Sequence, residues 1–217
     1  MTDPRTTFDP TIYADATLAG LSVLIPVPGI DWLLETFFER RIPFTIARRR
    51  NHKLSPEVII AFRPLPKGCL RGCLGLLLGA TVGLIKSLSR KIFYFLSVKE
   101  ATDKVSYHWR QAFLIDHMIL NGHLDQPATA RPARQAMEQI LRTTPNSVLI
   151  PLAHYIVTHA RQILRAIWRA RRGKTDEGVR QQREEIEARW RKFREYFQTL
   201  ATLYDQCYHE LKARPLA

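Results

Sequence analysis

Apolar residues recur at intervals of three and four along much of the chain, which is the spacing of one face of an α-helix. The clearest case is in the last seventy residues, where two such seams are joined by a short turn that contains Gly173. The first seam consists of Leu149, Ala153, Ile156, Ala160, Ile163, Ile167 and Ala170, and the second of Ile186, Trp190, Phe193, Phe197, Leu200, Tyr204, Cys207 and Leu211. This pattern predicts an antiparallel helical hairpin with arms at 147–172 and 175–213, whose small and aromatic residues interdigitate.

Further helices are predicted upstream. Ser97 and Glu100 have the spacing of a capping box, so we expect a helix from there to Gly122. Its apolar seam consists of Val98, Ala101, Val105, His108, Ala112, Ile115 and Ile119. Asp31 follows a Pro- and Gly-containing turn and predicts the start of another helix. That helix carries Ile30, Leu33, Leu34, Phe37 and Phe38 on one side, and Asp31, Glu35 and Glu39 on the other. No segment alternates with a period of two, so we expect an all-α helical bundle.

Residues 68–85 form a Leu- and Gly-rich stretch whose single charge is Arg71. Its five glycines are Gly68, Gly72, Gly75, Gly79 and Gly83. At about 100° per residue they share one helix face, although each glycine costs a helix interior about 1 kcal/mol relative to alanine. We therefore expect this glycine zipper to pack closely against another backbone, as small residues do between helices in lipid.

The length of this stretch leaves its relation to a membrane open. Residues 72–85 would extend about 21 Å as a helix, against a hydrocarbon core of about 30 Å. Three placements remain: the helix spans the membrane, lies in the headgroup region, or forms the core of a soluble bundle.

The formal net charge of +13 is unevenly distributed. Residues 40–99 contain thirteen Lys or Arg and one acid, Glu57, and so carry +12. A basic block of this kind indicates an anionic partner, either lipid headgroups or nucleic acid. The residues that we expect to contact an anionic surface are Arg40, Arg41, Arg48, Arg49, Arg50, Lys53, Lys86, Arg90 and Lys91.

Nucleic acid is the less favoured partner. Arg161, Arg165 and Arg169 recur at i, i+4 and could follow phosphates. However, the second arm of the hairpin contains several acids, among them Glu184 and Glu185, and we expect these to lie alongside the arginines and neutralise them.

The chain lacks the residue spacings of a catalytic or metal site. His154 and His159 would diverge by about 140° on a helix, and Cys69 and Cys73 have no His or Cys partner nearby in the sequence. We therefore predict no catalytic residue, no bound metal, no cofactor and no enzymatic activity. Three cysteines do not form a disulfide framework and fit a reducing compartment. The first fifteen residues carry three Asp and one Arg, so we expect no cleavable signal and a cytosolic N-terminus.

One run of motifs resembles a known family. It consists of a Pro-x-Pro-Gly-Ile-Asp turn after an apolar run, an apolar helix, a basic patch, the string LSPEVI and the Gly-rich helix. Over residues 18–90 this order resembles EcsC-like bacterial proteins and the uncharacterised helical domain attached to some bacterial GTPases. The resemblance implies a helical, membrane-associated protein without established chemistry. The chain has no GxxxxGK[ST] loop, so any GTPase would be a separate chain.

Together these features predict three regions: a flexible tail at 1–15, an apolar and basic region at 16–96 that faces a membrane or partner, and a helical bundle at 97–217. The expected function is that of a non-enzymatic scaffold or adaptor on the cytoplasmic side of a membrane, peripheral or partly inserted. Its C-terminal hairpin would bind a protein partner, or a second copy of the chain. The alternative is a soluble, cytoplasmic, all-α module that binds nucleic acid or protein.

Overall fold

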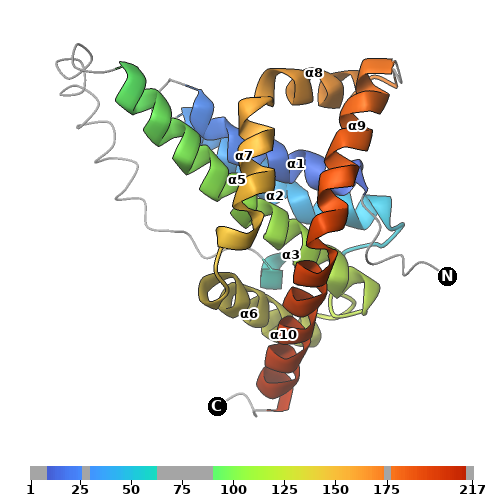
Figure 1. The fold of residues 1–217 in the computed structure, drawn as a ribbon. Coiled ribbons are helices and arrows are strands. Elements are labelled where there is room, and N and C mark those ends of the chain that lie inside the picture. Colours follow the sequence, from blue (N-terminus) through green and yellow to red (C-terminus); the bar gives the residue numbers. More distant parts are fainter. Residues whose placement is uncertain (1–8, 26–29, 63–89, 174–176, 214–217) are drawn as a thin grey trace.

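The computed structural model describes residues 9–25, 30–62, 90–173 and 177–213 (Figure 1). Within these ranges all regular structure is helical and no strand occurs, which confirms the predicted all-α bundle. The α-helices are α1 (Pro10–Leu21), α2 (Ile30–Arg49), α3 (Pro56–Phe62), α5 (Arg90–Leu120), α6 (Pro127–Thr143), α7 (Ile150–Thr158), α8 (Ala160–Arg171), α9 (Glu177–Trp190) and α10 (Arg194–Ala213). Three 3₁₀ turns connect some of them: η2 (Ser22–Leu24), η3 (Ser147–Leu149) and η4 (Arg191–Phe193).

Helix α5 is the central element of the fold. It runs diagonally through the molecule and packs against α1, α2, α6, α7 and α10 (Figure 1). Six of the seven residues of the seam predicted from the sequence are buried, and Val98 is partly buried. Trp109, Phe113, Leu114 and Met118 on its other sides are buried as well. Residues on nearly all sides of α5, both apolar and polar, are thus covered by other elements, as its central position requires.

Helix α5 begins earlier than the capping box indicated. It starts at Arg90 and passes through Ser97 without interruption. The prediction of a helix start at Ser97 is therefore wrong, because extending an existing helix costs less than starting a new one. The expected boundary between residues 96 and 97 consequently falls inside one helix. The regions on either side of it share one core, since α1 and α2 both pack against α5.

The N-terminal tail is shorter than expected, because residues 10–15 belong to α1. The Asp9 carboxylate accepts a hydrogen bond of 2.9 Å from the backbone N–H of Thr11, and Pro10 occupies the first turn. Proline is compatible with that position, where its missing N–H would have no helical partner. Ile12 and Tyr13 are buried in the core. Pro10 thus begins a helix inside the segment that was expected to be a flexible tail.

Close backbone contact between helices occurs at Gly20 of α1. A Cβ atom on Gly20 would lie 2.6 Å from the Cα of Val105 in α5, a separation that real Cβ atoms do not show. This is the kind of contact predicted for the glycine zipper. The zipper itself, from Gly68 to Gly83, lies outside the described residues.

The first arm of the C-terminal hairpin is divided into two helices. Helix α7 ends at Thr158, His159 leaves helical geometry at φ −102° and ψ 19°, and α8 then runs across the top of the view in Figure 1. The apolar seam divides with it: Ala153 and Ile156 are buried in the part of the chain that packs against α5, whereas Ala170 is exposed.

The second arm descends as a nearly continuous column of α9 and α10 (Figure 1). Its aromatic seam packs against α1 and α5, with the Trp190 ring 4.6 Å from Tyr13 and 5.7 Å from Trp109, centroid to centroid. The two arms contact each other through α8 and α9, whereas α7 packs mainly against α5.

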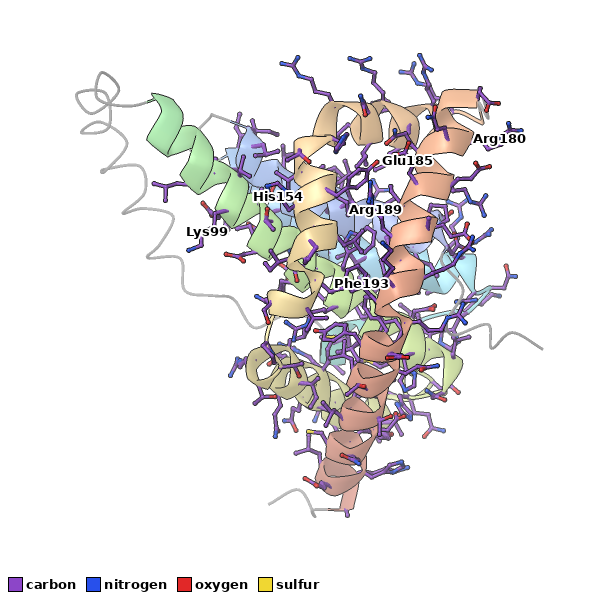
Figure 2. All side chains as sticks on the ribbon, in the orientation of Figure 1. Lys99, His154, Arg180, Glu185, Arg189 and Phe193 are labelled. Atoms are coloured by element: carbon purple, nitrogen blue, oxygen red, sulfur yellow. The ribbon has the colours of Figure 1, made fainter. Side chains whose placement is uncertain are left out.

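Polar side chains connect the two arms. The Tyr155 hydroxyl of α7 donates a hydrogen bond to Glu185 of α9, and the Arg189 guanidinium lies 3.8 Å from the centroid of the Tyr155 ring. Figure 2 shows Glu185 and Arg189 on the side of α9 that faces α7.

A buried arginine of α5 holds the C-terminal end of α6. Arg110 is fully buried and donates hydrogen bonds to the carbonyl oxygens of Leu141 at 3.2 Å and Thr144 at 2.9 Å. It also donates to the carbonyl of Ile140 and to the side-chain oxygen of Asn146. The last carbonyls of a helix have no partner within the helix, so Arg110 supplies the donors that α6 lacks.

Candidate functional site

Helix α2 exposes a stripe of large apolar side chains. Ile30, Leu33, Phe37 and Phe44 are separated by three, four and seven residues and therefore share one helix face. Their exposed fractions are 42%, 58%, 51% and 46%, and neighbouring Trp32 is 57% exposed. We call Ile30, Leu33, Phe37 and Phe44 the α2 stripe; at about 100° per residue, Trp32 lies at least 100° from each of them around the helix. Large exposed apolar groups gathered on one helix face are typical of an interaction surface.

The orientation of α2 is the reverse of that of an ordinary core helix. Most of the apolar side predicted from the sequence faces outward, while Glu35 on the opposite side contacts α5. The buried residues of α2 are Ile42, Ile46 and Ala47, near its C-terminal end. The N-terminal half of α2 is therefore bound to the bundle through polar contacts, and this leaves its apolar side open.

Basic residues border the α2 stripe. Arg40, Arg41 and Arg48 are exposed on α2, and Lys53 is exposed just beyond its C-terminal end. The Arg41 guanidinium lies 5.4 Å from the centroid of the Phe37 ring, so charge and apolar surface meet directly. These four residues were among those predicted to contact an anionic surface.

Three residues of that prediction are paired within the fold, including Arg41, whose Nε lies 3.7 Å from the carboxylate of the buried Asp15. Arg50 donates two hydrogen bonds of 2.7 Å to the carboxylate of Asp116, and this contact raises the pKa of the guanidinium. Arg49 forms an ion pair of 2.5 Å with Asp9, next to the start of α1. These contacts attach α2 to neighbouring elements, and the contact of the arginines with an anionic surface stays a prediction. Their acidic partners lie far away in the sequence, where spacing gave no signal.

The remaining residues predicted to be functional cannot be placed. Lys86 lies outside the described residues, as do the five glycines of the zipper. Arg90 and Lys91 belong to the first turn of α5, and the structure does not describe their side chains.

Glu35 is the polar anchor that joins α2 to α5. Its carboxylate accepts a hydrogen bond of 2.6 Å from Lys104 Nζ and lies 3.4 Å from His108 Nε2. Burial by itself raises the pKa of Glu35, but the hydrogen bonds from His108 and Lys104 outweigh it and lower the pKa to about 2. Glu35 is therefore ionised at neutral pH and stabilises the outward orientation of the α2 stripe.

This anchor predicts a pH dependence of stability. Because the folded-state pKa of Glu35 is depressed, its contribution is complete above the ordinary value of 4.5 and is lost as the pH falls toward about 2. We expect Glu35→Gln to lower the free energy of unfolding by about 1–2 kcal/mol at pH 7 and to flatten its decline below pH 4.5. Urea unfolding at pH 7, 4.5 and 3 measures both effects.

Glu100 provides the control for this prediction. It also contacts Lys104, at 3.3 Å, but its side chain is 55% exposed. Glu100→Gln should change stability by less than about 0.5 kcal/mol, as expected for an exposed ion pair. Equal losses in the two variants would contradict the anchoring role of Glu35.

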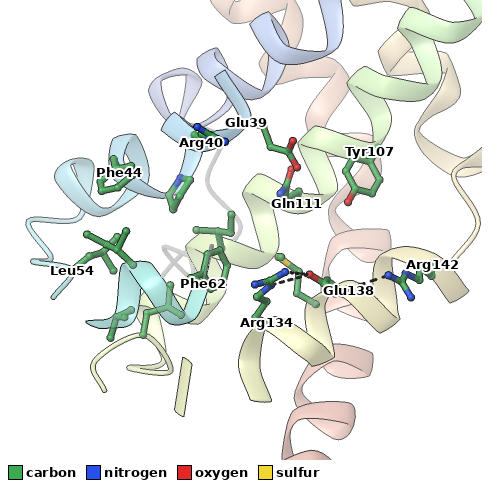
Figure 3. Close-up of a pocket in the computed structure, with 16 residues that line it drawn as sticks. Glu39, Arg40, Phe44, Leu54, Phe62, Tyr107, Gln111, Arg134, Glu138 and Arg142 are labelled. Atoms are coloured by element: carbon green, nitrogen blue, oxygen red, sulfur yellow. Dashed lines mark hydrogen bonds and ion pairs between the residues drawn. The ribbon is translucent and has the colours of Figure 1, made fainter. Parts of the chain in front are cut away.

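A cavity of about 490 Å³ adjoins the α2 stripe, among α2, α3, α5 and α6 (Figure 3). Apolar side chains form much of its wall: Pro43, Phe44, Leu54, Val58, Ile59, Phe62, Ile115, Leu124 and Met137. Phe44 belongs both to the stripe and to this wall, so the cavity opens beside the exposed face of α2. Its volume lies within the range of small-molecule sites, about 300–1,000 Å³.

Charged and polar residues occupy one side of this cavity. On α6, Arg134 Nε donates a hydrogen bond of 2.8 Å to Glu138, and Arg142 lies 4.0 Å from the other oxygen of the same carboxylate. Figure 3 shows this row of charges across the cavity from Phe44, Leu54 and Phe62. The cavity therefore has a polar side and an apolar side.

The wall contributed by α5 is connected to the Glu35 anchor. Gln111 lines the cavity, and its Oε1 lies 3.1 Å from Nδ1 of His108. The other nitrogen of the same ring faces Glu35. His108 thus contacts both Gln111 in the cavity wall and Glu35, which attaches α2 to α5.

Asp116 and His117 are adjacent on α5 but bind partners in different parts of the chain. Asp116 binds Arg50, while the adjacent His117 places Nε2 2.8 Å from the Asp205 carboxylate of α10. Within the described part of the chain, no three His, Cys, Asp or Glu residues are arranged to hold a metal ion. The arrangement around Asp116 and His117 thus joins α5 to α2 and α10.

The basic face of α8 is a second charged surface. Arg161, Arg165 and Arg169 are exposed, and Trp168 is 60% exposed with the Arg172 guanidinium 5.2 Å from its ring centroid. Side chains project outward from α8 in Figure 2. This surface offers the matched controls used below.

The acids of α9 have partners on α9 itself or on α7. Glu177 and Glu184 contact Arg180 of the same helix, and Glu185 accepts the Tyr155 hydrogen bond. Neighbours at i, i+3 and i, i+4 on one helix are close enough to form such pairs.

Among the helices that the structure describes, none combines the length and the apolar character that a membrane crossing requires. Comparisons with protein-family models, curated proteins and solved structures find no match to this chain.

Sequence reasoning did not identify the cavity. The spacing of Arg134, Glu138 and Arg142 at i, i+4 was a readable signal for one charged edge. No sequence signal showed that the wall formed by α2 and α3 would lie opposite, because that depends on how four helices pack.

Proposed function

We propose that the protein is a non-enzymatic, peripheral membrane protein that binds anionic lipid surfaces through the α2 stripe and its basic border. The observation that carries this proposal is the exposure of Leu33, Phe37 and Phe44 on the same helix face as Arg40 and Arg41. A helix with apolar side chains on one face and arginines at its edges suits the boundary between headgroups and acyl chains.

Two terms contribute to binding. Insertion of the stripe removes apolar surface from water, at about 25 cal/mol per Å². Each Arg or Lys near an anionic surface adds about 1 kcal/mol, and salt screens this second term alone. Tryptophan and phenylalanine suit the interface, where their rings lie at headgroup depth.

The proposal includes a scaffold or adaptor role on the cytoplasmic side of the membrane, in line with the resemblance to EcsC-like proteins. With the α2 stripe on lipid, the outer faces of α9 and α10 would remain available to a protein partner or a second copy. The alternative is the soluble module that binds nucleic acid or protein, for which the α8 arginines are the supporting feature.

We expect the protein to cosediment with vesicles of mixed phosphatidylcholine and phosphatidylserine, and less with phosphatidylcholine alone. Raising the salt concentration should weaken binding without abolishing it, because apolar burial is not screened. The double variant Leu33→Ser/Phe37→Ser should bind the mixed vesicles about tenfold more weakly, since it removes two large apolar groups of the stripe. Both residues are more than half exposed, so the fold should tolerate the change.

Trp168→Ser is the matched control, because Trp168 is as exposed as Leu33 and, like Phe37, lies beside an arginine. Its vesicle binding should equal that of the unmodified chain. Equal loss in both variants would mean that the α2 stripe has no special role. Absence of binding to any vesicle would favour the soluble alternative, which a salt-dependent nucleic-acid titration would then test.

A further inference from the structure

We infer that the cavity among α2, α3, α5 and α6 binds a single-chain amphiphile with an anionic head, such as a fatty acid or a lysophosphatidic acid. The cavity encloses about 490 Å³. Its apolar wall on α2 and α3 suits an acyl chain, and its charged edge on α6 suits a carboxylate or phosphate. This inference goes beyond vesicle binding, because it concerns one lipid molecule inside the protein.

The apolar wall supplies the first half of the argument. Phe44, Leu54 and Phe62 stand on one side of the cavity, away from the charged row (Figure 3). Val58 is fully buried behind them, whereas Leu54 and Phe62 are partly exposed. Apolar surface in a concave site binds an apolar chain, with few polar groups needed to fix its orientation.

The charged residues on α6 indicate which charge the head group of the ligand carries. On α6 two arginines, Arg134 and Arg142, accompany one acid, Glu138, so this edge carries an excess positive charge. Guanidinium groups match the geometry of carboxylate and phosphate oxygens and form strong, charge-assisted hydrogen bonds with them. An anionic head is therefore complementary to this edge, and a neutral head is not.

Glu138 shows how the edge is held before a ligand arrives. Its carboxylate lies between Arg134, at 2.8 Å, and Arg142, at 4.0 Å. It thus occupies the position that a ligand carboxylate or phosphate would compete for. When an anionic head binds, the arginines exchange the Glu138 carboxylate for the ligand. The affinity then reflects the difference between these two interactions.

The position of the cavity indicates the source of the ligand. Phe44 belongs to the α2 stripe and to the cavity wall, and Arg40 is in both the basic border and the lining. If the stripe rests on lipid as proposed, a single-chain amphiphile can pass from the surface into the cavity over a short distance. Binding itself can be measured without vesicles, so the cavity is testable even if the stripe does not bind lipid.

The test uses cis-parinaric acid, a fluorescent fatty acid, titrated into the full chain below its micelle concentration and without vesicles. We expect saturable binding, displaced by oleate and by oleoyl lysophosphatidic acid, and displaced at least tenfold less effectively by oleyl alcohol. Comparing the first two competitors distinguishes a carboxylate from a phosphate head. Displacement by oleyl alcohol at the same concentration as oleate would overturn the anionic assignment, and absence of saturable binding would overturn the inference.

Three variants assign the site. Leu54→Trp should fill the apolar side and weaken binding at least tenfold, while Leu203→Trp on α10, also partly exposed, should not. Arg142→Gln should weaken oleate binding by about tenfold, which is the value of a lost charge-assisted hydrogen bond. Arg161→Gln on α8 removes the same charge elsewhere and should leave binding unchanged.

Glu138→Gln is expected to strengthen binding, which a misfolded variant would not do. Removing the competing carboxylate frees the donors of Arg134 and Arg142 for the ligand, so oleate should bind severalfold more tightly. Weaker or unchanged binding would contradict the exchange at the charged edge. If Leu54→Trp binds as the unmodified chain does, parinaric acid binds elsewhere and the cavity assignment is wrong.

Discussion

Replacing Arg110 with methionine is expected to lower the free energy of unfolding by about 3 kcal/mol or more. The variant keeps an unbranched side chain of similar length but loses every donor to the carbonyls of Ile140, Leu141 and Thr144. A buried polar group left without a partner costs about 1–3 kcal/mol, and here several lose theirs together. Urea or thermal unfolding, followed by circular dichroism, measures the loss.

Arg131→Met is the control for this prediction, because Arg131 is exposed on α6 itself. It should change stability by less than about 0.5 kcal/mol. Arg110→Lys should fall between the two, since an ammonium group is a compact donor that cannot reach several carbonyls as a planar guanidinium does. A stable Arg110→Met variant with its α6 residues still protected from hydrogen exchange would contradict this capping role.

The second large effect is expected at Gly20, where alanine should destabilise the protein by about 2–3 kcal/mol. Its methyl group would meet the Val105 backbone at 2.6 Å, and a backbone cannot rotate away as a flexible side chain can. The helices α1 and α5 must then separate, with the cost of an overpacked core. Thermal unfolding measures the change.

Gly178→Ala separates the steric effect from helix propensity. Gly178 lies in the first turn of α9 and is exposed, so alanine there should be neutral or stabilising by up to about 1 kcal/mol. The same substitution thus has opposite signs at two helical positions. Stabilisation by Gly20→Ala would mean that α1 and α5 are not in close contact.

The helices were predictable because their signals are local. The spacing of three and four residues in the α5 seam identified a buried face, and six of its seven residues are buried. The aromatic seam of the second arm was found in the same way, and Trp190, Phe197 and Tyr204 are all buried. A helix face is determined within a few turns, so the sequence contains it directly.

The neighbours of each face were not predictable in this way. The hairpin arms were expected to pack against each other; they meet at α8 and α9, whereas α7 packs mainly against α5 and α10 mainly against α6. The same limit applies to α2, whose apolar side was recognised but not its exposure. Glu35 decides that orientation, and its partners Lys104 and His108 are about seventy residues away in the sequence.

The candidate site contains residues that local patterns indicated and contacts that no local pattern indicated. Arg40, Arg41, Arg48 and Lys53 were predicted as an anionic-surface contact from the local charge excess, and they are exposed where that role requires. Arg50 belonged to the same local pattern but is bound to Asp116, which no local pattern could indicate. The cavity forms only when the helices pack. The sequence contains the charged residues of α6 and the apolar residues of α2 and α3, but it does not show that they face each other.

The contact between Tyr13 and Trp190 has a consequence for synthesis of the chain. Their ring centroids are 4.6 Å apart, although one residue is near the start of the sequence and the other near its end. Ribosomes add about 5–20 residues per second, so α1 waits roughly ten seconds or more before its aromatic partner emerges. During that interval the apolar face of α1 is only partly covered. The nascent chain thus remains a substrate for chaperones until α9 is complete, and truncation before Trp190 leaves Tyr13 without this ring partner.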